Sequence, residues 1–155
     1  MTNDEKMDLT EEEIKTLKNL IQKDKLQQEE WAYISNLLHK RRLYIAVTSV
    51  DKQKSNEEFF RSIIKDEDGN IPAFTTEDRC HEYLDEHPST APYVCAGSLP
   101  FISLAFLADK YKVRVLIDRD NDRFLGYDGE TGMFWIYVVE NAKYAGITVE
   151  KLKNG

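Results

Sequence analysis

Residues 113–118, Val113-Arg114-Val115-Leu116-Ile117-Asp118, form the clearest predicted strand of the chain. The stretch is almost continuously apolar and rich in β-branched side chains, which is typical of a strand inside a sheet. We therefore expect it to be paired on both sides, since exposing such a strand at a sheet edge is costly.

A predicted helix over residues 99–112 leads directly into this strand. Ser98 can cap its N-terminus after a turn at Gly97, and Pro100 is tolerated in its first turn. The helix is apolar on most sides, so we expect it to be deeply buried. The side chains that make it so are Phe101, Ile102, Leu104, Phe106 and Leu107.

Other predicted elements alternate between strand and helix along the chain. Strands are predicted over residues 43–50, 93–96, 123–127 and 134–140, and a helix over residues 77–86. Residues 59–64 and 71–75, on either side of the turn residues 66–70, are predicted to form a hairpin. Pro72 then lies near a strand start or on an unpaired edge. The tail over residues 147–152 is compatible with a strand or a final helical turn.

The first forty residues are predicted to be helical. Thr10 and Glu13 have the spacing of a capping box, and an apolar stripe follows. Polar residues 22–25 interrupt this stripe, which leaves open one bent helix or two joined helices. The basic run 39–42 suits a helix C-terminus or, alternatively, a patch for an acidic partner. The fold class is therefore α/β (α+β), with a single mixed β-sheet, an N-terminal helical segment and flanking helices.

The composition predicts one folded domain and argues against nucleic acid and membranes as its partners. The chain has 155 residues, 41% of them apolar and 11% aromatic, so it can bury a sizeable core. Its 21 basic and 28 acidic residues give a net charge of −7, which repels nucleic-acid phosphates and anionic lipid headgroups. No nucleic acid and no membrane is an expected partner, since no apolar run approaches the roughly 20 residues that span a bilayer. The charged N-terminus does not predict a signal peptide.

The cysteine and histidine pattern does not predict a zinc site or a nucleophile. Cys80 and Cys95 are too few for a disulfide framework, and we expect reduced thiols in a cytoplasmic protein. Cys80, His81, His87 and Cys95 are close in sequence, but neighbouring residues on a helix point about 100° apart. A Cys–His pair also lacks a third, orienting group.

Alternating aspartates suggest calcium ligands but lack the rest of a calcium loop. Asp118, Asp120 and Asp122 have the alternating spacing, yet Arg123 and Gly129 stand where the loop needs glycine and glutamate. The acidic turn over residues 66–70 fails in the same way. We expect no catalytic residue, no metal and no cofactor.

The stretch Gly69-Asn70-Ile71-Pro72-Ala73-Phe74-Thr75-Thr76-Glu77-Asp78 resembles the SseB protein N-terminal domain family. The order of elements over roughly residues 30 to 120 is similar to that family as well. The resemblance implies a single domain over residues 1–155: a helical extension over about 1–29, an SseB-like core over about 30–120, and a C-terminal hairpin and tail over about 121–155. It implies no established catalytic residue. The turn Asp118-Arg119-Asp120-Asn121-Asp122 departs from the Asn-Pro-like turn common in the family.

An aromatic hairpin near the C-terminus is the candidate interaction surface. It turns at residues 129–132, and strand alternation places Phe134 and Ile136 on one face and Trp135 and Tyr137 on the other. Either the N-terminal helix covers the second face or a partner does, and the candidate contact residues are Tyr127, Trp135 and Tyr137.

Two functions follow from these patterns. The first is a non-enzymatic SseB-like domain that acts in the cytoplasm through protein contacts, with a protein partner or as a homodimer. The second is a small-ligand- or anion-binding protein, or a small enzyme, that uses the loop before the Ser98 helix, where free N–H groups can bind an anion.

Overall fold

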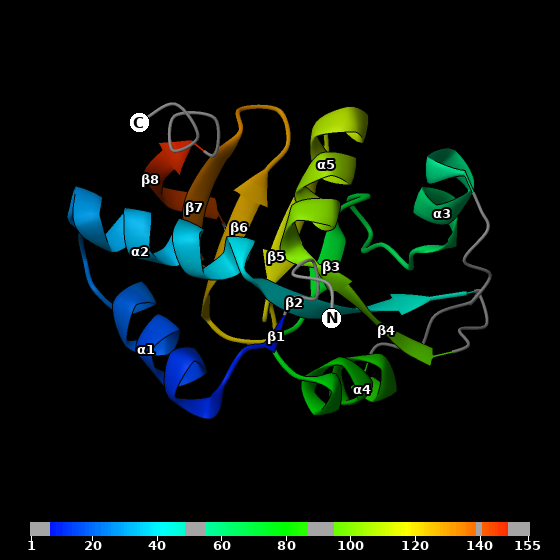
Figure 1. Cartoon of the computed structure of the whole chain (residues 1–155), viewed down its shortest axis with the longest axis horizontal. Helices are drawn as coiled ribbons and strands as arrows, with labels where there is room; N and C mark the ends of the chain where they lie inside the picture. The colour runs from blue at the N-terminus through cyan, green and yellow to red at the C-terminus, as the bar shows by residue number, and fades with distance from the viewer. Residues whose placement is uncertain (1–6, 49–54, 87–94, 139–140, 149–155) are drawn as a thin grey trace.

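A computed structural model describes residues 7–48, 55–86, 95–138 and 141–148, with only the backbone described at 95–96 and 141–148 (Figure 1). Its helices are α1 (Glu11–Ile21), α2 (Gln28–His39), α3 (Asn56–Ser62), α4 (Glu77–Glu86) and α5 (Phe101–Tyr111). Its strands are β1 (Met7–Asp8), β2 (Arg41–Val47), β3 (Ile71–Ala73), β4 (Cys95–Pro100), β5 (Arg114–Ile117), β6 (Arg123–Asp128), β7 (Met133–Val138) and β8 (Asn141–Thr148). The α+β class is confirmed.

The strands form two mixed sheets rather than the single sheet expected. One sheet has the order β1-β2-β4, and the other has the order β3-β5-β6-β7-β8. The strand β5 pairs with β3 in parallel and with β6 in antiparallel orientation, so its predicted place inside a sheet is confirmed.

The gap between the two sheets follows from a proline. Tyr44 and Phe74 exchange two backbone hydrogen bonds of 2.9 and 2.8 Å. The next hydrogen-bonded pair of an antiparallel ladder would be Ala46 with Pro72, and Pro72 has no N–H to donate. The carbonyl of Ala46 instead accepts from the N–H of Ile64 at 2.9 Å. The ladder between β2 and β3 therefore ends after one pair.

The main core lies between the helices α1, α2 and α5 and the sheets behind them (Figure 1). Phe101, at the start of α5, is fully buried in this core. Its ring contacts Tyr127 edge-on at 5.8 Å and stacks on Phe134 at 5.6 Å. A smaller cluster lies on the other face of β2, where Ala46 meets Phe74 and the α4 side chains.

The N-terminal segment forms two helices, which settles the alternative left open by the sequence. Thr10 and Glu13 make the predicted capping box at α1, with hydrogen bonds of 3.0 and 3.1 Å. Glu13 also accepts from Nε of Arg41 at 2.9 Å, which holds α1 against β2. At the other end of α1, Arg123 donates to the carbonyls of Ile21 and Lys23.

Two predicted elements are wrong. Residues 59–64 do not form a hairpin strand, because Ser55 and Glu58 make a capping box that begins α3; only Ile63 pairs, in a single bridge with Val47. Gly97 and Ser98 do not form a turn either, because β4 pairs with β2 from end to end. The predicted strand residues 49–50, 93–94 and 139–140 and the tail residues 149–152 lie outside the described ranges.

We predict that Gly129→Ala destabilises the protein by about 2–3 kcal/mol, because any side chain there overpacks the turn against α5. A Cβ atom on Gly129 would lie 2.0 Å from the carbonyl oxygen of Ala108 and 2.5 Å from that of Val113. Gly97→Ala is the matched control, since its Cβ would have no atom nearer than 3.8 Å. Urea unfolding measures both, and equal losses of stability would contradict the prediction.

A second prediction concerns pH. The hydrogen bond from Arg41 lowers the pKa of Glu13 from 4.5 to about 2. Because the folded pKa lies below the unfolded one, the ionised carboxylate stabilises the fold above about pH 4.5, and this contribution is lost as the pH falls toward 2. Glu13→Gln keeps a capping side chain but not the charge. We expect the difference in unfolding free energy between Glu13→Gln and wild type to become smaller as the pH falls from about 4.5 toward 2. A difference that stays constant would contradict the assignment.

Candidate functional site

The candidate site lies where the parallel strands β3 and β5 end. Thr75 and Asp118 follow these strands at the same sheet edge, and the N–H of Asp118 donates to the carbonyl of Ala73 at 2.8 Å. Ligands of open α/β sheets bind beyond the carboxyl ends of the strands, which makes this edge the first place to examine.

Asp118 is a buried carboxylate bound by one residue on two sides. Its Oδ1 accepts from the backbone N–H of Thr75 at 2.9 Å, and its Oδ2 accepts from the Thr75 hydroxyl at 2.8 Å. Its backbone has a φ of 55°, in the left-handed region that non-glycine residues rarely occupy. Nε of Arg79 lies 4.0 Å from Oδ2, and the same guanidinium binds Asp120 at 3.0 Å. Burial raises the pKa of Asp118, against the bonds from Thr75 that lower it.

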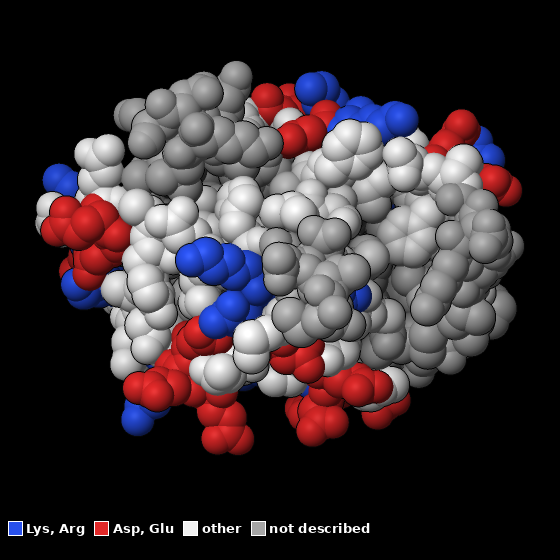
Figure 2. Space-filling view, viewed as in Figure 1, with Lys and Arg blue, Asp and Glu red and all other residues white. Residues whose placement is uncertain are grey.

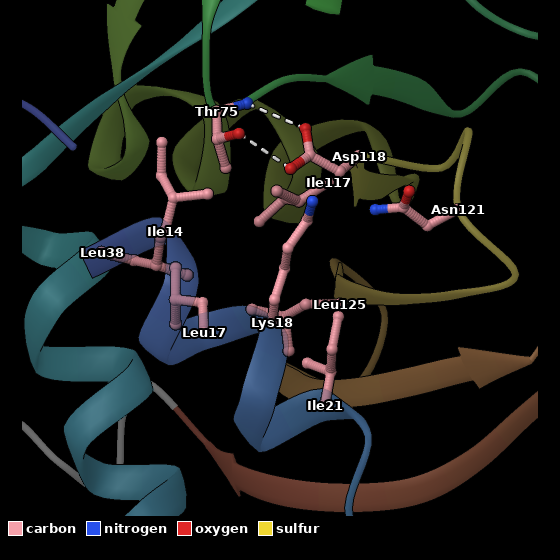
Figure 3. Close-up of a pocket in the computed structure, with 10 residues that line it drawn as sticks. All are labelled: Ile14, Leu17, Lys18, Ile21, Leu38, Thr75, Ile117, Asp118, Asn121 and Leu125. Carbon is pink, nitrogen blue, oxygen red and sulfur yellow. Dashed lines mark hydrogen bonds between the residues drawn. The ribbon is translucent and has the colours of Figure 1, made fainter. Parts of the chain in front are cut away.

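A small cavity of about 20 Å³ opens between this carboxylate and α1 (Figure 3). Figure 3 shows the ammonium group of Lys18 rising from α1 toward Asp118, and the side-chain amide of Asn121 turned toward the same space. This volume is enough for about one water molecule. The other lining residues are Ile14, Leu17, Ile21, Leu38, Thr75, Ile117 and Leu125.

A wider groove of about 410 Å³ adjoins the cavity. The two share Lys18, Ile21 and Asn121, and the remaining groove residues are Asn19, Gln22, Asp122 and Arg123. The guanidinium of Arg123 fixes the groove wall, since it binds the end of α1. Three carboxamides, on Asn19, Gln22 and Asn121, therefore line one open recess that continues into the cavity beside Asp118.

The side chains once considered as metal ligands do not come together. No group of three or more His, Cys, Asp or Glu residues that could hold a metal ion occurs in the described part of the chain. Cys80 is buried under β2, whereas His81 is half-exposed and lies 3.5 Å from Glu77. His87 and the side chain of Cys95 lie outside the described residues.

The three predicted interaction residues lie on two different faces of the five-stranded sheet. Tyr127 is buried on the core side, and its hydroxyl donates to Asp109 at 2.7 Å. Tyr137 and Trp135 face the other side, as strand alternation predicts. Tyr137 stacks on Phe124 at 5.5 Å, and burial raises its pKa to about 12.

Trp135 is the one of these three residues that keeps partial exposure. Its ring Nε1 is buried without a hydrogen-bond acceptor among the described residues. The ring of Tyr137 lies over Gly126, where a Cβ atom would come within 2.4 Å of it. The aromatic face is therefore packed largely against itself.

Ser98 does not begin a helix. It lies inside β4, and its hydroxyl accepts from Nε of Arg42 at 2.7 Å. The helix starts later, at Phe101 with Pro100 in the capping position. The predicted anion site at a Ser98 helix N-terminus therefore has no structural basis.

Sequence reasoning missed an exposed apolar face on α5. Ile102 and Phe106 are 41% and 53% exposed, and they lie one turn apart on the outer side of the helix. The expectation that this helix is deeply buried is wrong for this side, because the sheets and α2 cover only its inner side. Lys110, one turn further along, is also exposed. The signal was present, since a helix that is apolar all round needs cover on every side.

Charge on the surface is unevenly distributed. Figure 2 shows acidic side chains gathered along the lower edge, over α1 and α4, and at the left end of α2, with basic side chains near the right end of α2 and charges of both signs over the upper end of α5.

No family model, curated protein or solved structure matches this chain. Among the described residues, no helix is long and apolar enough to cross a membrane.

We predict that Thr75→Val destabilises the protein by about 1–3 kcal/mol, because it removes a donor from a buried carboxylate while keeping the shape of the side chain. Thr75→Ser keeps the hydroxyl and should retain most of the stability. Thermal and urea unfolding of the two variants make the comparison, and equal stability of Thr75→Val and wild type would show that the hydroxyl contributes nothing.

Proposed function

We propose that this chain is a non-catalytic protein-binding or regulatory module of the SseB-like kind, and that it acts in the cytoplasm. The observation that carries the proposal is the outer face of α5, hereafter the α5 face, formed by Ile102, Phe106 and Lys110. Large apolar side chains that stay exposed next to each other mark contact sites on soluble proteins.

The inner side of α5 shows why the outer side is unusual. Phe101, Leu104 and Ala108 are buried against the sheets, so packing already fixes the helix without Ile102 and Phe106. Burying an exposed Ile or Phe side chain stabilises a protein or complex by about 1.5–3 kcal/mol. In the folded chain alone, Ile102 and Phe106 stay partly exposed and gain only part of this free energy. A partner that covers the α5 face would gain the remaining hydrophobic free energy as binding affinity.

The occupant that fits best is a short amphipathic segment of another protein. A stable dimer buries about 800 Å² on each copy, whereas the α5 face offers two apolar side chains on an 11-residue helix. An amphipathic helix with apolar anchors one turn apart matches this stripe. Lys110 is exposed, and its ammonium group lies over the Tyr111 ring, 5.9 Å from the ring centre. The segment should therefore carry an acidic residue one turn beyond its anchors.

The chemistry of the interior supports binding rather than catalysis. The buried carboxylate of Asp118 is bound to Thr75, and the Tyr127 hydroxyl is bound to Asp109. These groups stabilise the fold and leave surface contact as the function that the α5 face favours.

The proposal is tested by photo-crosslinking in cells that express the protein naturally, with a photoreactive phenylalanine analogue at position 106 and, as control, at position 33. Tyr33 is 41% exposed, as Ile102 is, but lies on α2. We expect position 106 alone to capture one protein, through a segment with apolar and acidic residues. The purified partner should then bind the Ile102→Ser/Phe106→Ser variant at least about tenfold more weakly, with an unchanged melting temperature.

Three results would count against this assignment. Equal capture at positions 33 and 106 would indicate nonspecific contact. Capture of a second copy of the chain would indicate a homodimer. If the double variant bound the partner with unchanged affinity, the contact surface would not be the α5 face.

A further inference from the structure

The recess beside α1 holds two opposite charges that face each other without meeting. The ammonium group of Lys18 points at the carboxylate of Asp118 across the cavity (Figure 3). Within the described ranges, Asp118 forms an ion pair with Arg79, and none is recorded with Lys18. The space between the two groups is about 20 Å³, enough for one small polar group.

The opposite charges of Lys18 and Asp118 restrict which chemical group can occupy the cavity between them. A carboxylate or phosphate oxygen there would approach the Asp118 carboxylate, and an ammonium group would approach Lys18. A hydroxyl group avoids both repulsions, since it donates one hydrogen bond and accepts others. It can donate to Asp118 and accept from Lys18 at the same time.

Asp118 has the capacity for such a bond. A carboxylate offers about four lone-pair positions, and Thr75 uses two of them. Because Thr75 and the backbone hold the carboxylate in place, the acceptor is already oriented before a ligand arrives, which lowers the cost of binding.

The adjoining groove suits the rest of a hydroxyl-bearing molecule. Its carboxamides, on Asn19, Gln22 and Asn121, each donate and accept hydrogen bonds, as hydroxyl groups do. With Lys18 and Asp118, the residues Asp122 and Arg123 give the whole recess two charges of each sign, so it favours no ion strongly. Its volume of about 410 Å³ falls within the range of small-ligand sites.

We propose that this recess binds a small neutral polyhydroxylated molecule, a sugar or polyol, with one hydroxyl seated between Lys18 and Asp118. The site is separate from the α5 face, so this proposal goes beyond the protein-binding function and does not depend on it. No aromatic side chain of the described residues lines the groove, and the expected affinity is therefore in the millimolar range.

The test follows backbone amide signals by two-dimensional NMR while D-glucose, D-ribose or glycerol is added up to about 50 mM, a range chosen for millimolar affinity. We expect at least one of the three to cause saturable shifts at Lys18, Asn121 and Asp122. Lys18→Met keeps most of the side-chain length and removes the donor, and it should weaken the binding at least about tenfold. Lys15→Met removes the same charge from an exposed position of α1 outside the recess, and it should leave the affinity unchanged.

The opposite results are equally clear. The proposal is wrong if none of the three compounds gives saturable shifts, which would leave a single water as the occupant of the cavity. It is also wrong if acetate or phosphate saturates the same signals and the three compounds do not, or if Lys18→Met binds them as wild type does.

Discussion

The missing N–H of Pro72 is the constraint from which the architecture follows. It ends the ladder between β2 and β3 after the Tyr44–Phe74 pair and leaves the Ala46 carbonyl to Ile64. The strands therefore divide into two sheets, and the helices α2 and α5 contact both of them. The carboxyl end of β3 lies beside that of its parallel neighbour β5, where Thr75 meets Asp118. The recess depends on this arrangement.

The parts of the fold with a strong local signal were predictable. The capping box of Thr10 and Glu13 and the interior strand β5 follow from short-range pattern alone. Residues 59–64 were misread because Phe59, Phe60 and Ile63 look like a strand, whereas the capping box at Ser55 favours a helix. Gly97 and Ser98 were misread because their pairing with β2 is a long-range contact that no local pattern contains.

The candidate sites were less predictable for a related reason. Strand alternation placed Trp135 and Tyr137 on a common face correctly, but it did not reveal that Tyr137 would lie flat over Gly126 and stack on Phe124. The recess combines Lys18 from α1 with Asn121, about a hundred positions later, and the sequence indicated the loop around Asp118 only as a turn with an incomplete calcium-loop pattern. The exposed pair on α5, Ile102 and Phe106, was predictable from the helix pattern: the helix is apolar on most sides, and packing against the sheets covers only its inner side.

The two hydrogen bonds from Arg123 to the end of α1 bear on how the chain folds during synthesis. They join residues 102 and 100 positions apart in the sequence. The helix α1 can begin to coil as soon as it leaves the ribosome, but the guanidinium that fixes its C-terminus emerges only after most of the chain has been made. Until then its apolar stripe lacks the β6 surface that it covers in the finished protein. Nascent chains should therefore expose this stripe to chaperones until β6 and Arg123 have left the ribosome.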